Sequence, residues 1–94
     1  MAIVISTGNI SREYEVLDSI FALDSHKEGF FSGNVDPGKA FDGVKRQLQD
    51  KCNALGGDAV ISCQFEYRNA LADGMFGKKQ AIEIFAYGTA VRYL

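Results

Sequence analysis

Apolar residues recur at helical spacing through the middle of the chain. The series runs Phe41, Val44, Leu48, Cys52, Leu55. Steps of three or four residues place these side chains on one stripe of an α-helix, and no strand could present them on one face. Asp36-Pro37 suits the start of this helix, because Asp accepts hydrogen bonds from the first turn and Pro fits the first helical position. Gly56-Gly57 suits its end, because glycine readily adopts the left-handed conformation that closes a helix.

After Asp58 the pattern changes to a period of two. The apolar set is Ala59, Ile61, Cys63, Phe65, Tyr67, and the residues between its members are mostly polar. This alternation predicts a half-buried strand over 59–68 with one core face and one polar face. Because only a Gly-Gly turn separates the two elements, we expect the helical stripe to pack on the apolar face of this strand.

Three further segments read as strands. Ala2 to Ile5 is a short apolar run, and Tyr14 to Leu23 carries apolar residues on both faces. Gln80 to Tyr93 alternates again and forms the last predicted strand. Asp24 to Val35 and Asn69 to Lys79 are rich in turn residues and are predicted to be loops. The order is therefore β-β-α-β-β, an α+β fold in which one helix packs on an antiparallel sheet.

The last strand has two unlike faces. One face is Ile82, Ile84, Ala86, Gly88, Ala90, and its small residues suit close packing against the helix. Phe85 and Tyr87 lie on the opposite face. One helix covers only one face of a sheet, and a contiguous apolar patch left in the open usually marks an association surface. We therefore expect a homo-oligomer.

Composition narrows the class of protein. The chain of 94 residues is expected to form a single domain over residues 1–94. A net charge of -2 argues against nucleic acid as a partner, since phosphate binding needs a basic face. No apolar stretch is long enough to span a membrane, and Met1 to Ser6 lacks the features of a signal peptide. We therefore expect a cytoplasmic protein that does not interact with membranes.

Three residues are candidate metal ligands. Cys52 falls on the helical stripe and Cys63 on the apolar face of the following strand, so the two thiols could meet at the helix–sheet interface. Thiolates favour soft metal ions, but free Cys also serves as a small buried residue. No Cys-x-x-Cys is present, and a closed zinc site usually needs four ligands. His26, in a predicted loop beside Asp24 and Glu28, is the third candidate, with a solvated surface histidine as the alternative.

No catalytic motif is evident. Ser25 and Ser32 lie near His26, but no nucleophile-elbow pattern surrounds them. Gly74 to Lys79 combines glycines with lysines, yet lacks the phosphate-loop pattern. The sequence therefore predicts a non-enzymatic domain without a resident cofactor, whose role is association or the binding of a small ligand.

Several short runs carry a family resemblance. They are Ala54-Leu55-Gly56-Gly57-Asp58-Ala59-Val60-Ile61, Phe65-Glu66-Tyr67, Gly88-Thr89-Ala90-Val91, Asn9-Ile10 and Tyr14-Glu15-Val16. In these runs the chain resembles the YbjQ-like family of small proteins, which are often labelled as heavy-metal-binding. The resemblance implies an α+β fold and assembly into a ring, commonly a pentamer, and the biochemical function of the family is not established. It also keeps heavy-metal binding through Cys52 and Cys63 as the alternative function.

Overall fold

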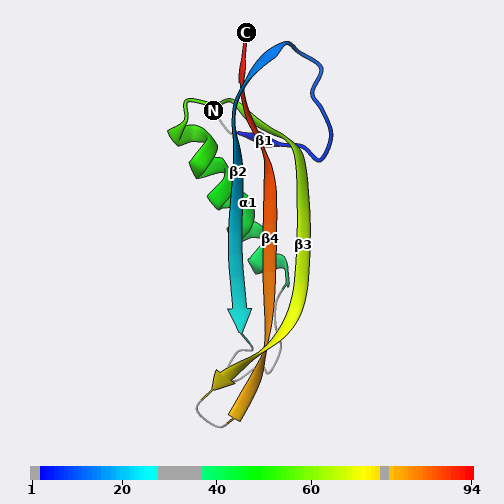
Figure 1. Ribbon diagram of the computed structural model, residues 1–94, viewed down its shortest axis with the longest axis vertical. Coiled ribbons are helices and arrows are strands. Elements are labelled where there is room, and N and C mark those ends of the chain that lie inside the picture. Colours follow the sequence, from blue (N-terminus) through cyan, green and yellow to red (C-terminus); the bar gives the residue numbers. More distant parts are fainter. Residues whose placement is uncertain (1–2, 28–36, 75–76) are drawn as a thin grey trace.

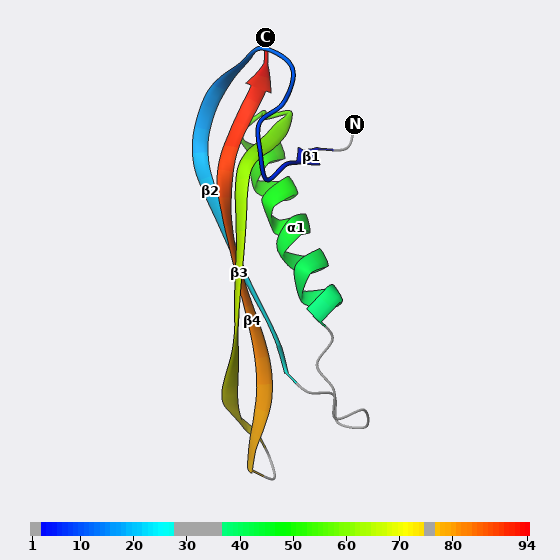
Figure 2. The same cartoon turned by 90° about the vertical axis from the view of Figure 1, so that its right-hand side faces the viewer.

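The computed structural model describes residues 3–27, 37–74 and 77–94, with side chains described for 3–24, 38–68 and 83–94. The elements are β1 (Val4–Ile5), β2 (Tyr14–Lys27), α1 (Pro37–Ala54), β3 (Ala59–Gly74) and β4 (Gly77–Tyr93). Their order confirms the predicted β-β-α-β-β arrangement (Figure 1). Figure 2 shows that α1 lies on one face of the sheet only.

The four strands form one sheet in the order β1-β3-β4-β2. β4 is antiparallel to both β2 and β3, whereas β1 runs parallel to β3, with Val4 opposite Ala59. The prediction of an antiparallel sheet was therefore wrong for one strand pair, and the sheet is mixed. A parallel pair needs a long crossover connection, and β2 with α1 supplies it between β1 and β3.

The strands are longer than their patterns predicted. β2 continues to Lys27, β3 continues to Gly74 and β4 begins at Gly77. The described parts of the predicted loops over 24–35 and 69–79 are therefore strand, and 28–35 lies outside the described residues. Pairing explains the extension, because the β3–β4 ladder continues to the pair Gly74–Gly77 and its backbone hydrogen bonds need no alternating pattern. The molecule is consequently elongated, with extents of 54 × 21 × 18 Å.

The ends of α1 follow the predicted signals. The helix begins at Pro37, while Asp36 lies outside the described residues. At the other end Gly56 has a φ of 77°. The Gly57 N–H donates to the Cys52 carbonyl oxygen at 2.9 Å, and the Gly56 N–H donates to that of Asn53 at 3.0 Å. This pair of bonds is the Schellman closure, which requires a left-handed residue that glycine supplies without strain.

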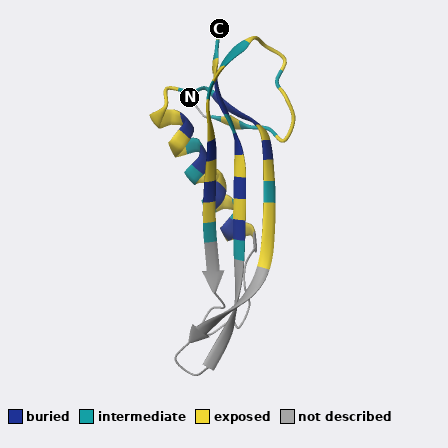
Figure 3. Cartoon of the chain, in the orientation of Figure 1, coloured by how far each residue is buried: buried dark blue, intermediate teal, exposed yellow. Residues whose placement is uncertain are grey.

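The main core lies between α1 and the sheet (Figure 3). Its buried members are Ile20, Ala22, Ala40, Val44, Leu48, Cys52, Val60, Cys63, Ile84, Ala86, Ala90. The helical stripe is thus confirmed for its central residues, and Phe41 packs against the cluster from its margin. Leu55 was wrongly placed on this stripe. It follows the last helical residue and is 44% exposed, because the closing turn carries it away from the sheet.

A β-bulge divides β3 into two halves. The register against β4 shifts between Ile61 and Gln64, and Ser62 has a φ of 52°. Val60 and Cys63 both pack in the main core, whereas Ala59 and Ile61 belong to a second cluster with Val91. The prediction of one continuous apolar face over 59–67 was therefore wrong. The extra residue of a bulge shifts the alternation by one, so residues that alternate in sequence change faces.

Candidate functional site

Four large apolar side chains lie together on β2 and β4, on the sheet face opposite α1. Phe21, Leu23, Tyr87 and Phe85 are 61%, 56%, 41% and 39% exposed. In the β2–β4 register Phe21 is opposite Tyr87 and Leu23 is opposite Phe85. The ring centroids of Phe85 and Tyr87 are 5.7 Å apart, and those of Phe21 and Phe85 are 6.4 Å apart. We call these four residues the apolar face.

The alternation of the strands fixes this orientation. Ile20 and Ala22 of β2, like Ile84 and Ala86 of β4, are buried in the main core beneath α1. Because successive side chains of a strand point to opposite faces, the residues between them must point away from the helix. The prediction that Phe85 and Tyr87 lie opposite the helix is confirmed. Their neighbours on β2 were not singled out, because that strand is apolar on both faces and its register cannot be read from the sequence.

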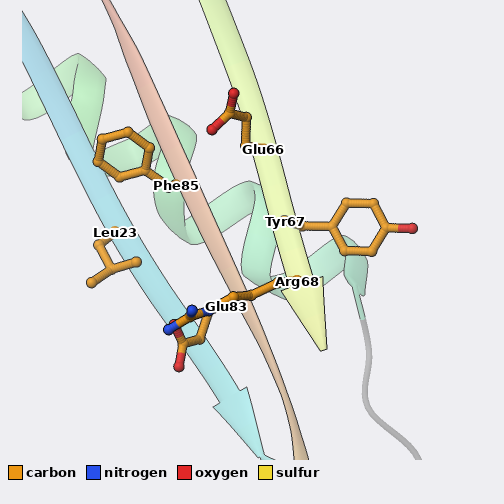
Figure 4. A pocket seen from close by; sticks show the side chains of 6 residues that line it. All are labelled: Leu23, Glu66, Tyr67, Arg68, Glu83 and Phe85. Atoms are coloured by element: carbon orange, nitrogen blue, oxygen red, sulfur yellow. The ribbon is translucent and has the colours of Figure 1, made fainter. Parts of the chain in front are cut away.

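A shallow groove of about 430 Å³ continues from the apolar face towards β3 (Figure 4). It is lined by Leu23, Glu66, Tyr67, Arg68, Glu83, Phe85. Arg68 donates to Glu83 Oε2 from Nη2 at 3.0 Å and from Nε at 3.1 Å, which fixes an ion pair across β3 and β4. The groove therefore offers an apolar floor with a charged margin.

Side chains from α1 hold the β2 edge of the apolar face in place. Gln47 Nε2 donates to the carbonyl oxygen of Leu23 at 3.0 Å, and Lys51 Nζ donates to that of Phe21. The Lys51 ammonium also lies 5.0 Å from the centroid of the Phe21 ring, within the range of a cation–π contact. The helix therefore fixes the backbone beneath the apolar face without covering its side chains.

The two cysteines lie in the main core, Cys52 from α1 and Cys63 from β3, and both are fully buried. Burial raises the pKa of both thiols, and the carboxylate of Asp58 raises that of Cys52 further. The Cys52 thiol donates to the carbonyl oxygen of Ala59 at 3.4 Å. Both thiols are consequently neutral at pH 7, whereas metal binding requires the thiolate.

His26 lies on β2 and not in a loop as predicted, because its backbone pairs with Ile82 of β4. Its side chain is outside the part that the structure describes. Within that part, no three His, Cys, Asp or Glu side chains gather into a metal site. The metal assignment of Cys52, Cys63 and His26 therefore stays a prediction.

No helix in the described ranges combines the length and the apolar character needed to span a bilayer. One helix on a mixed sheet whose other face is partly bare defines the chain as a small two-layer α+β domain. Residues 39–94 match the family model YbjQ_1, described as "Putative heavy-metal-binding", and the chain belongs to this family. No curated protein matches the chain.

A solved structure has the same fold. It is that of a protein of unknown function in the DUF74 family from Pediococcus pentosaceus, and it superposes with a TM-score of 0.73 over 98% of each chain. The two sequences are 23% identical, so this likeness supports the architecture and carries no activity across.

Proposed function

We propose that this chain is a non-enzymatic, self-associating domain whose copies meet through the apolar face. The observation that carries the proposal is the register of β2 and β4, which sets Phe21 opposite Tyr87 and Leu23 opposite Phe85 with all four side chains exposed. Fully burying a side chain of this size contributes about 1.5–3 kcal/mol. Covering the face therefore favours association strongly enough to offset part of its entropic cost.

The surroundings of the apolar face support the same function. Interfaces between proteins commonly have an aromatic, apolar centre and a polar margin. Here the margin is the ion pair of Arg68 with Glu83 and the carboxylate of Glu66, all of which line the groove. A groove of about 430 Å³ is also large enough for a small apolar ligand, which a second copy would enclose.

The test is the mass of the particle in solution. Size-exclusion chromatography with light scattering at tens of micromolar protein is expected to give a multiple of 10.3 kDa for the wild type. Leu23→Lys with Phe85→Lys is expected to lower the mass below that of the wild type. Val4→Lys is the matched control, because Val4 is 53% exposed but lies on β1, and it should keep the wild-type mass.

A monomeric wild type at this concentration would defeat the proposal. An equal loss of mass in Val4→Lys would show that added charge, and not the apolar face, controls association.

The second candidate is a soft-metal site formed by Cys52 and Cys63, with His26 as a further ligand. Two observations favour it, the description of the family and the presence of both thiols in one core cluster. Metal uptake would have to displace both thiol protons and open the core. Titration with Zn²⁺ or Cu⁺, followed by thiolate–metal absorbance, tests it against Cys52→Ala with Cys63→Ala. No uptake at stoichiometric metal would remove this candidate.

A further inference from the structure

The outer edge of β2 is covered by hydrogen bonds from side chains. Its outward carbonyl groups at Phe21 and Leu23 accept from Lys51 and Gln47 of α1. The backbone N–H of Ser19 on the same strand donates to Asp18 Oδ1 at 2.8 Å. Covering an edge with polar and charged side chains is a common way of preventing it from pairing with another strand.

The outer edge of β3 is covered only along its first residues. β1 pairs with Ala59 and Val60, the Ser62 N–H donates to the Gly8 carbonyl oxygen at 2.8 Å, and the Cys63 N–H donates to that of Ser6 at 2.9 Å. Beyond Cys63, none of the residues that the structure describes pairs with the outer side of β3. The strand itself continues to Gly74, so among the described residues its outer edge beyond Cys63 has no partner strand.

Hydrogen-bond alternation shows which groups this edge presents. Since the carbonyl groups of Phe21 and Leu23 point outward, their β4 partners Tyr87 and Phe85 direct their own backbone groups towards β3. The β3 residues opposite those two are Gln64 and Glu66.

The residues that alternate with them are Phe65 and Tyr67. Their backbone N–H and C=O groups therefore point away from β4, towards the outer edge of β3. Tyr67 is 65% exposed, and none of the described residues pairs with its outward side.

We propose that this edge of β3 pairs antiparallel with the same edge of a second copy, about a two-fold axis at Tyr67. The open stretch begins at Gln64, so this axis pairs residues 64–70 of one copy with 70–64 of the other. Tyr67 then lies opposite Tyr67 of the second copy in a hydrogen-bonded position. The pairing extends the sheet across the two copies. It uses the backbone edge of β3 and not the four side chains of the apolar face, although Glu66 and Arg68 also line the neighbouring groove.

Charge selects this partner and this register. An axis at Tyr67 places Glu66 opposite Arg68 of the second copy, twice over, and opposite charges in directly facing positions stabilise a strand pair. Arg68 uses Nε and Nη2 for Glu83 of its own chain, which leaves Nη1 for the second copy, and its side chain is 74% exposed. A two-fold axis at Asn69 would keep the same pattern of backbone hydrogen bonds, but it would no longer place Glu66 opposite Arg68.

Site-specific crosslinking tests the pairing. In a hydrogen-bonded antiparallel pair the Cα atoms are about 5.5 Å apart, within the range that a disulfide spans. Tyr67→Cys, oxidised with diamide at tens of micromolar protein, is therefore expected to form a covalent dimer in at least about ten-fold higher yield than Gln64→Cys. The native Cys52 and Cys63 are fully buried, so the wild type supplies the baseline.

Three outcomes would overturn the proposal. A higher yield from Asn69→Cys than from Tyr67→Cys would move the axis, and equal yields from all three variants would show random collision. Loss of the Tyr67→Cys dimer in the Leu23→Lys, Phe85→Lys background would assign the contact to the apolar face. Persistence in that background supports the β3 contact, even if the wild type proves unable to associate through the apolar face.

A charge variant tests the register separately. Glu66→Lys in the Tyr67→Cys chain places two cations opposite each other and is expected to lower the dimer yield several-fold. An unchanged yield would contradict the facing positions of Glu66 and Arg68.

Discussion

The Cys52 sulfur packs directly against the backbone of Gly57, where the end of α1 meets the start of β3. A Cβ atom at Gly57 would lie 2.6 Å from Cys52 Sγ, 3.1 Å from the Cys52 carbonyl oxygen and 3.2 Å from that of Val91. Two of these three neighbours are backbone atoms, which cannot rotate away. The close packing at the end of α1 therefore depends on the missing side chain.

Gly57→Ala is accordingly expected to destabilise the fold by about 1–3 kcal/mol, because the added methyl group would crowd Cys52 and the carbonyl oxygen of Val91. Urea unfolding followed by circular dichroism measures the change. Gly8→Ala is the matched control, since nothing lies within 4 Å of its added Cβ, and it should change stability by no more than about 0.5 kcal/mol. Equal losses in the two variants would contradict the packing at Gly57.

Two leucines from the same predicted helical stripe should contribute differently to the free energy of unfolding. Leu48 is fully buried, and Leu48→Ala is expected to cost about 2–5 kcal/mol through lost burial and a cavity. Leu55 is 44% exposed, and Leu55→Ala is expected to cost less than about 1 kcal/mol. Thermal and urea unfolding of both variants check this, and a cost at Leu55 equal to that at Leu48 would contradict the observed end of the helix.

The buried thiols should make stability fall at alkaline pH. Burial raises the pKa of Cys52 and Cys63 above their ordinary value of 9.0, so the folded state binds these protons more tightly than the unfolded chain. The contribution of the two thiols to the free energy of unfolding is complete below pH 9.0. It is lost as pH rises through the raised pKa of each folded thiol, because the thiols of the unfolded chain lose their protons first.

Urea unfolding between about pH 7.5 and 10.5 measures this decline around the ordinary thiol pKa. In the Cys52→Ala, Cys63→Ala variant the decline should be shallower, since only other groups still titrate. Identical slopes for the two proteins would show that the thiols do not contribute to it.

The bulge in β3 should be sensitive to the shape of its left-handed residue. Ser62 has a φ of 52°, a conformation that disfavours β-branched side chains and that Asn tolerates. Ser62→Val is expected to cost about 1–3 kcal/mol, whereas Ser62→Asn should stay within about 0.5 kcal/mol of the wild type. The side chain is exposed, so buried packing does not obscure the comparison. Equal stability of the two variants would place the strain elsewhere.

The sequence was most informative where local chemistry determines structure. The apolar spacing from Val44 to Cys52 and the glycine pair after the helix predict α1 and its closure, because both depend on neighbours close in sequence. The alternation of β4 likewise identified Phe85 and Tyr87 as residues facing away from the helix. These two residues form half of the apolar face.

What could not be predicted depends on contacts between distant segments. The bulge at Ser62 exists because β3 must match β4 on one side and the segment from Ser6 to Gly8 on the other. The parallel pairing of β1 and the strand position of His26 also arise from partners far along the chain. The other half of the apolar face, on β2, becomes visible only when the register with β4 is known.

The central position of β4 has a consequence for biosynthesis. β2 finds its whole partner strand in the last element of the domain, with Tyr14 opposite Tyr93. During translation, β2 therefore leaves the ribosome well before its partner strand has been synthesised. Until β4 emerges, β2 therefore has no native strand to pair with.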